Sequence, residues 1–337
     1  MSRLGRTLAI AAGEIAAIFC VLVLFAHVRG YEVAKTVEQD PSLPHFTVGG
    51  VVLHGETFGS PEDPTVIAVH GGPGLDHRNL LPLKALSDEF FVVLYDQRGT
   101  GLSPRVDDDE LTLDSYLADL DALVERYSPG RKVNLIGHSW GGMLVSSYLG
   151  LHPEKVGRVV LAAPGPLDDE MAAGFDSKSD IRVRYLLHVA GSWLLSPLAS
   201  GPDPHASADW FQYQMLAAFE GNDSLFDGHF CNREPPRLAH WRLGRRAWIA
   251  LRKSYFSGRE PRAGLMERVE HVGKEVLFIA GACDLILGPE FQREQMVLFP
   301  KASLVVIDRV GHEMFAENPG ASIAPVRAYL RMPLSAP

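Results

Sequence analysis

The chain has 337 residues, of which 46% are hydrophobic, and a formal net charge of −9. Its acidic residues are spread along the chain and it has no basic patch, which argues against a nucleic-acid-binding protein. Three cysteines do not suggest a disulfide framework or a metal site, and no H-x-x-x-H pattern lies near an acid, so we expect no metal and no other cofactor. The sequence leaves open whether Cys231 and Cys283 pair.

The N-terminal segment, residues 1–30, contains a long apolar run. Residues 7–28 are apolar apart from Glu14 and His27. At about 1.5 Å per residue, this run is long enough to cross a hydrocarbon core of about 30 Å, which predicts an uncleaved transmembrane helix. Arg3 and Arg6 favour an N-terminus inside the cell and the rest of the chain outside the cytoplasm. A cleaved signal peptide and a buried or interfacial helix remain open alternatives.

A linker is predicted over 31–44, followed by a hairpin with a Gly49-Gly50 turn. Strand-like and helix-like stretches then alternate, which predicts an α/β fold with a mostly parallel sheet covered by helices on both faces. The predicted strands are Thr65–Val69, Phe90–Leu94, Lys132–Ile136, Arg158–Ala163, Val276–Ala280 and Leu304–Ile307. The predicted helices are His77–Ser87, Leu113–Tyr127, Met143–Leu151, Glu290–Leu298 and Pro319–Leu330.

The alternation stops between Pro164 and Arg262. We therefore expect a core in two parts, 45–164 and 263–332, with a helical cap over 165–262 inserted between them. This stretch is rich in aromatic residues, which are expected mainly to hold the cap helices together and in part to line a pocket. They are Trp193, Trp210, Phe211, Tyr213, Trp241, Trp248 and Tyr255.

A nucleophilic serine is predicted at the turn between a strand and a helix. The segment Gly137-His138-Ser139-Trp140-Gly141 follows the strand 132–136 and precedes the helix 143–151. A G-x-S-x-G turn in this context holds the serine in a strained conformation, and side chains at the glycine positions would clash with the strand and helix. Ser139 is therefore the predicted nucleophile.

The base and its acid are expected after two later strands. Asp284 follows the strand 276–280, and His312 follows the strand 304–307. The chemistry of a parallel sheet collects beyond the carboxyl ends of its strands, and the order Ser, Asp, His fits this architecture. Asp168 and Asp169, after the strand 158–163, are the rival candidates for the acid.

Two backbone amides are predicted to stabilise the oxyanion. One is the amide of Trp140, at the N-terminus of the helix that follows Ser139. The other lies in His70-Gly71-Gly72-Pro73-Gly74, after the strand 65–69, where glycines let amides point inward. We assign it to Gly72, with Gly71 as the alternative.

Three motifs together resemble the proline iminopeptidase branch of the α/β-hydrolase family. They are His70-Gly71-Gly72-Pro73-Gly74, then Asp96-Gln97-Arg98-Gly99-Thr100-Gly101-Leu102-Ser103, then Gly137-His138-Ser139-Trp140-Gly141-Gly142. The match spans about 43–330. The resemblance implies a serine hydrolase that removes an N-terminal residue, often proline, from short peptides. It also implies that Asp96 and Arg98 are structural, forming a loop and an ion pair beneath the active site.

The cap departs from that family. Members with prolyl specificity carry tryptophan- and glutamate-rich cap motifs that bind the substrate's free amine, and these are not found between Gly165 and Arg262. Cys283 also stands where the family usually has an aromatic or basic residue. Glu220 and Glu234 are the first candidates for an amine-binding acid, with Glu170 a third.

Three functions follow from these residues. The first is an aminopeptidase acting on small peptides, attached to the membrane through residues 1–30. The second is a carboxylesterase or amidase on the same core, with a cap suited to an apolar acyl or alcohol group. The third is a non-catalytic binding module, which an intact Ser139, Asp284 and His312 disfavours. Carboxylates that face the serine would favour the first function, and an apolar pocket the second.

Overall fold

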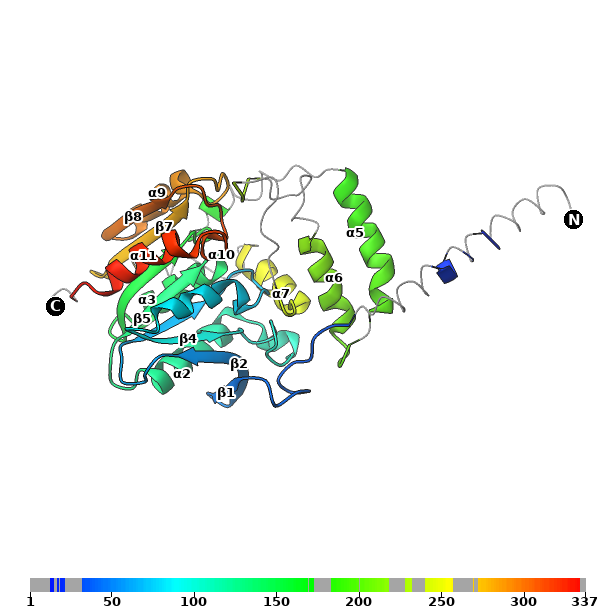
Figure 1. Cartoon of the computed structure of the whole chain (residues 1–337), viewed down its shortest axis with the longest axis horizontal. Helices are drawn as coiled ribbons and strands as arrows, with labels where there is room; N and C mark the ends of the chain where they lie inside the picture. The colour runs from blue at the N-terminus through cyan, green and yellow to red at the C-terminus, as the bar shows by residue number, and fades with distance from the viewer. Residues whose placement is uncertain are drawn as a thin grey trace, which may run out of the picture.

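The computed structural model describes residues 13–14, 17, 19–21, 32–168, 170–172, 183–199, 201–217, 228–231, 240–256, 269 and 272–333. Within them, eight strands form one sheet, helices lie on both of its faces, and a further group of helices lies beyond one end of it (Figure 1).

The sheet combines an antiparallel hairpin with six parallel strands. Gly49 and Gly50 have φ values of +55° and +83° and make the predicted hairpin turn. The strand order is β1-β2-β4-β3-β5-β6-β7-β8, with β2 antiparallel to β4 and every later pair parallel. The bounds are β1 His45–Val48, β2 Val51–Phe58, β3 Thr65–Val69, β4 Phe91–Tyr95, β5 Val133–His138, β6 Val156–Ala162, β7 Glu275–Gly281 and β8 Lys301–Ile307.

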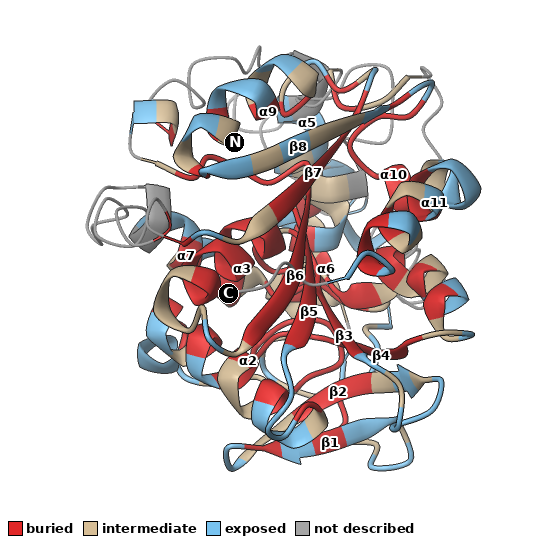
Figure 2. Ribbon diagram, turned by 90° about the vertical axis from the view of Figure 1, so that its left-hand side faces the viewer, coloured by how far each residue is buried: buried red, intermediate tan, exposed pale blue. Residues whose placement is uncertain are grey.

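Two apolar clusters pack against the two faces of the sheet. In β3, Ile67 and Val69 join one cluster, whereas Val66 and Ala68 join the other, because alternate residues of a strand point to opposite faces. The first cluster includes residues of α2 (Leu113–Tyr127) and α3 (Trp140–Leu151). The second includes residues of η1 (His77–Leu86), α10 (Met314–Glu317) and α11 (Pro319–Leu330). The central strands are consequently buried along most of their length (Figure 2).

The predicted elements are found with small differences at their ends. The bounds of β3, α2 and α11 are those predicted from the sequence. The helix predicted over 77–87 is instead a 3₁₀ helix, η1, with Pro82 inside it. In an α-helix the ring of Pro82 would clash with the carbonyl group four residues earlier, which disfavours α-helical geometry here. The helix predicted over 290–298 is α9 (Pro289–Gln295) followed by η4 (Met296–Leu298), and η2 (Asp108–Glu110) was not predicted.

Helices α5 (Val183–Leu195), η3 (Ser196–Leu198), α6 (Ala206–Ala217) and α7 (Arg245–Phe256) lie between β6 and β7 in the sequence. Helices α5 and α6 lie beside each other, away from the sheet (Figure 1). The buried carboxylate of Asp209 on α6 accepts hydrogen bonds from Arg105 at 2.9 Å and Arg242 at 2.8 Å. The charge-assisted bond from Arg105 ties α6 to the loop after β4, and the bond from Arg242 ties it to the segment before α7. The predicted cap boundaries, 165 and 262, remain a prediction.

The transmembrane helix predicted within residues 1–30 is wrong. In the part of the chain that the structure describes, none of the helices has the length and apolar character needed to cross a membrane. A crossing requires about 20 consecutive apolar helical residues, and an apolar run in a sequence does not ensure such a helix. Of residues 1–30, all but 13–14, 17 and 19–21 lie outside the described residues. Three further predictions depended on that helix and are wrong with it: attachment to the membrane, a single membrane crossing and a location outside the cytoplasm.

Candidate active site

Ser139 stands at a strained turn between β5 and α3. Its φ is +53° and its ψ is −118°, a conformation that residues with a side chain rarely adopt. A Cβ on Gly137 would lie 2.5 Å from the carbonyl oxygen of Gly141, and one on Gly141 would lie 2.1 Å from that of Val69. Both glycines are therefore required by close backbone packing, as predicted. Ser139 itself is half-buried.

The loop 70–74 lies directly beside the serine. A Cβ placed on Gly71 would be 3.0 Å from Cβ of Ser139, so this loop passes close beside Ser139. Gly72 has a φ of +131°, which only glycine adopts without strain. Trp140 is the first residue of α3, at the positive end of the helix dipole. These positions suit the predicted donors, Gly72 and Trp140, and their action on an oxyanion remains a prediction.

Asp284 and His312 are joined by a hydrogen bond between His312 Nδ1 and Asp284 Oδ2, at 2.9 Å. Asp284 lies on the loop after β7, and His312 lies on the loop after β8. A Cβ on Gly281 would be 2.1 Å from the carbonyl oxygen of Gly311, which shows how closely the two loops approach. The parallel register of β7 and β8 thus brings the predicted acid and base together at one edge of the sheet.

The pKa shifts of Asp284 and His312 are those expected for an ionised carboxylate that holds a histidine. Burial alone would raise the pKa of Asp284, but the imidazoles of His229 and His312 outweigh it and hold that pKa well below its usual range. Burial alone would lower the pKa of His312, but the hydrogen bond to Asp284 and its charge raise it. Asp284 therefore stays ionised at neutral pH and keeps a proton on Nδ1 of His312.

The residue before Ser139 contacts His312. Nε2 of His138 lies 3.0 Å from the backbone carbonyl oxygen of His312, and the two ring centroids are 4.8 Å apart. The hydrogen bonds of the described residues include none between the Ser139 hydroxyl and His312. The structure therefore brings the three predicted residues to one edge of the sheet, and the triad as a working unit remains a prediction.

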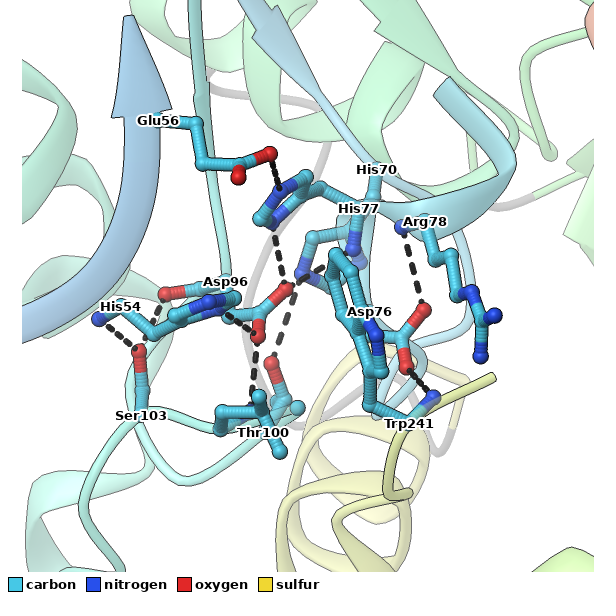
Figure 3. Close-up of polar contacts among 12 residues, drawn as sticks. His54, Glu56, His70, Asp76, His77, Arg78, Asp96, Thr100, Ser103 and Trp241 are labelled. Carbon is cyan, nitrogen blue, oxygen red and sulfur yellow. Dashed lines mark hydrogen bonds and ion pairs between the residues drawn. The ribbon is translucent and has the colours of Figure 1, made fainter. Parts of the chain in front are cut away.

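The motif from Asp96 to Ser103 forms a buried network beneath the loop 70–74 (Figure 3). Asp96 accepts hydrogen bonds from Nδ1 of His54 at 2.7 Å and Nδ1 of His77 at 2.8 Å, and from the amide of Leu102 at 2.7 Å. Burial opposes protonation of His77, but Asp96 outweighs it and raises the pKa of His77 to about 9. His54, His77 and Asp96 are close enough to hold a metal ion, but the atoms that face each other are already hydrogen-bonded.

The same motif contacts the loop 70–74 and α3. The amide of Gln97 donates to Nε2 of His70 at 3.1 Å, and the indole of Trp140 donates to the Gln97 side chain at 3.0 Å. The guanidinium of Arg98 forms a bidentate pair with Asp119, at 2.7 and 2.6 Å. The contacts of the motif 96–103 are therefore those of a structural support, as the resemblance to the family implied. Sequence reasoning missed His54 and His77 as the partners of Asp96, because they come from other elements and share no motif with it.

The structure describes two of the other acids considered from the sequence, Asp168 and Glu170. Asp168 accepts a hydrogen bond from the amide of Met171 at 2.7 Å, whereas Asp284 holds His312, so Asp284 is the better candidate for the acid. Glu170 is exposed. Asp169 and the two predicted amine-binding acids, Glu220 and Glu234, lie outside the described residues.

Several cap aromatics line a pocket of about 250 Å³. Trp210, Tyr213 and Trp241 contribute to its wall together with Asp209. Trp193 does not belong to this wall and is 64% exposed on α5. The wall of this pocket includes neither Ser139 nor His312, so the expectation that a few cap aromatics line a pocket over Ser139 stays a prediction.

Cys231 and Cys283 form a disulfide that joins the cap to the residue before Asp284. The sequence had left this pairing open. The same cap segment carries His229, whose Nδ1 lies 3.0 Å from Oδ1 of Asp284. Sequence reasoning missed His229, and the only signal was its place two residues before Cys231.

Comparison with known proteins shows the family. The sequence pattern described as the alpha/beta hydrolase fold matches residues 64–319, which is more than half of the chain. This chain belongs to the alpha/beta hydrolase fold family. The predicted α/β-hydrolase fold, with a mostly parallel sheet, is thereby confirmed.

Individual relatives support the proline iminopeptidase-like branch. The chain is 40% identical over 105 residues to a proline iminopeptidase of Heyndrickxia coagulans, a match that covers 29% of this chain and 34% of the relative. It is also 35% identical over 104 residues to a cis-3-alkyl-4-alkyloxetan-2-one decarboxylase of Shewanella oneidensis, covering 30% of this chain and 32% of that one. The chain thus spans about a third of the length of these curated relatives. The alpha/beta hydrolase therefore resembles, over about a hundred residues, proteins whose names denote different activities.

A solved structure extends the likeness of fold over most of the chain. The proline iminopeptidase-related protein from Thermus thermophilus superposes with a TM-score of 0.58 and 21% identity, covering 86% of this chain and 96% of that one. At this identity the comparison concerns the fold alone.

Proposed function

We propose that this alpha/beta hydrolase is a serine hydrolase that works through Ser139, His312 and Asp284. The hydrogen bond between His312 Nδ1 and Asp284 supports this most directly. It fixes the tautomer in which the other ring nitrogen of a neutral His312 carries the lone pair of a base. The strained, half-buried Ser139 at the same edge of the sheet is the matching nucleophile.

In this mechanism His312 takes the proton of the Ser139 hydroxyl as its oxygen attacks a carbonyl carbon. The amides of Trp140 and Gly72 stabilise the oxyanion that forms, and His312 then protonates the leaving group. Water attacks the acyl-enzyme with the same assistance and releases the acid. No metal or cofactor takes part in these steps.

The substrate class that we propose is a short peptide with a free N-terminus, from which the enzyme releases the first residue. The likeness to proline iminopeptidases over 105 residues supports this class. An aminopeptidase must bury the substrate's ammonium group, and a buried charge without a partner costs several kcal/mol. Its cap must therefore supply carboxylates, for which Glu220 and Glu234 remain the first candidates.

The proposal is tested by comparing aminoacyl arylamides with and without an N-acetyl group. For an aminopeptidase, acetylation should lower kcat/KM roughly 30- to 100-fold, the equivalent of about 2–3 kcal/mol. Glu220→Gln or Glu234→Gln should remove most of this discrimination. Glu62→Gln is the matched control, because Glu62 is exposed on the turn before β3, at the opposite end of that strand from the loop 70–74.

A short-chain aryl ester in the same assay tests the carboxylesterase alternative. An esterase with an apolar cap would turn over the ester readily and would prefer the acetylated, uncharged arylamide. Equal turnover of the free and acetylated arylamides would likewise contradict the aminopeptidase.

A further inference from the structure

A four-residue cap segment, 228–231, reaches both loops that carry the acid and the base. Its first two backbone carbonyls accept hydrogen bonds from the amides of Leu285 at 2.6 Å and His312 at 2.7 Å. Its last residue, Cys231, forms the disulfide with Cys283. The segment is thus fixed to the acid loop and the base loop at three points.

The same segment presents His229 to the carboxylate of Asp284. His229 is 6% exposed, and its Nδ1 lies 3.0 Å from Asp284 Oδ1, whereas Nδ1 of His312 lies 2.9 Å from Oδ2. The His229 and His312 rings pack with their centroids 4.6 Å apart. Asp284 therefore holds one histidine on each of its oxygens. A carboxylate accepts hydrogen bonds only, so a neutral His229 must donate from Nδ1.

The space around His312 is strongly acidic. The carboxylates of Asp284, Glu313 and Glu317 all raise its pKa, against the effect of burial. The other flanking groups, His138 and His229, are buried, and their lowered pKa values keep them neutral. A base must be unprotonated to accept a proton, so these carboxylates work against His312 at neutral pH. A second hydrogen-bond donor to Asp284 stabilises part of the negative charge of that carboxylate and so reduces its effect on the pKa of His312.

We propose that His229 is a positioning residue for the Asp284–His312 pair. It holds the second oxygen of Asp284 and shares the charge of that carboxylate, so that His312 stays available as the base. The cap thereby completes the active site of the core, with the disulfide as the tether of the segment. This inference rests on the proposed serine hydrolase function.

Substitution of His229 separates this role from a purely structural one. His229→Leu removes one donor to Asp284 Oδ1 and leaves the backbone amides of Ile286 and Leu287, at 3.0 and 2.9 Å. Asp284 should then act more strongly on His312, and the acid limb of the kcat/KM profile should move to higher pH. At the pH of half-maximal wild-type activity, kcat/KM should fall roughly tenfold, since a hydrogen bond to a charged group is worth about that factor. His229→Asn places an amide donor near the former Nδ1 and should return the limb towards its wild-type position.

Asp96 provides the matched control, because it too holds one histidine on each oxygen. His54 is 2% exposed and its Nδ1 lies 2.7 Å from Asp96 Oδ2. His54→Leu therefore removes an equivalent buried histidine from another carboxylate, and the acid limb should stay in place. An unchanged acid limb in His229→Leu, or an equal shift in His54→Leu, would overturn the proposal.

Histidine-selective NMR tests the same role without any substrate. In the wild-type protein, His229 should be found neutral with its proton on Nδ1 while His312 titrates, and His229→Leu should raise the pKa of His312. A His229 protonated on Nε2 alone would overturn the inference even if the variants did not fold. Failure of the serine hydrolase proposal would be recognised separately. In that case hydrolysis would survive in Ser139→Ala, while the NMR results for His229 and His312 would be unchanged.

Discussion

Replacement of Gly141 by alanine tests how the turn at Ser139 is built. The new Cβ would lie 2.1 Å from the carbonyl oxygen of Val69 and 2.7 Å from that of His70. Both atoms belong to the backbone, so no flexible side chain can move aside. The end of β3 and the start of the loop 70–74 must shift, or α3 must move away from them.

The expected magnitudes follow from this geometry. Overpacking of a buried site lowers the free energy of unfolding by about 1–3 kcal/mol. The displaced loop carries the predicted oxyanion donor Gly72, and loss of one such donor lowers kcat by about 10²- to 10³-fold. At a temperature where Gly141→Ala remains folded, its turnover should therefore still be greatly reduced. The loss of stability alone would not explain that reduction.

The assay combines thermal unfolding, followed by circular dichroism, with initial rates on a substrate that the wild type hydrolyses. Gly191→Ala is the matched control. Gly191 lies inside α5, and a Cβ there would meet nothing within 4 Å. Alanine should stabilise that helix by up to about 1 kcal/mol and leave the rate unchanged. A Gly141→Ala protein with wild-type stability and turnover would refute the packing argument for this turn.

Two further predictions concern charge. The pKa of His312 is raised above its usual value of about 6.5, and only its neutral form is a base. Activity should therefore be lost as the pH falls through that raised pKa, and a kcat/KM limb below pH 6 would contradict the assignment of His312. Arg98→Ala leaves the buried Asp119 carboxylate without its bidentate partner and should lower the free energy of unfolding by about 3–5 kcal/mol. Arg246→Ala breaks an exposed pair with Asp108 and should cost about 1 kcal/mol or less in the same denaturation experiment, so equal losses would refute this account.

The sequence predicts the central strands of the sheet well because they are buried on both faces. Continuous runs such as Thr65–Val69 and amphipathic helices such as Leu113–Tyr127 have patterns that follow directly from their burial. The places of Ser139, Asp284 and His312 could be predicted for a related reason. Each follows a recognisable strand, and parallel strands bring their carboxyl ends to one edge.

What the sequence could not predict depends on contacts between distant segments. His229 reaches Asp284 from an irregular cap segment, and His54 and His77 reach Asp96 from two separate elements. No periodicity or spacing records such contacts. Hydropathy also misled the interpretation of residues 7–28, because an apolar run satisfies a length criterion without establishing a membrane-spanning helix.

The central claim is that Ser139 is the nucleophile, and covalent labelling tests it most directly. An aryl fluorophosphonate should react once with the wild-type protein, at a rate slowed by a hydrolysed substrate, and mass spectrometry should place the adduct on Ser139. Ser139→Ala should fold, take up no label and lose on the order of 10⁴-fold or more in turnover. An adduct on another residue, or wild-type turnover in a folded Ser139→Ala protein, would contradict the serine hydrolase mechanism.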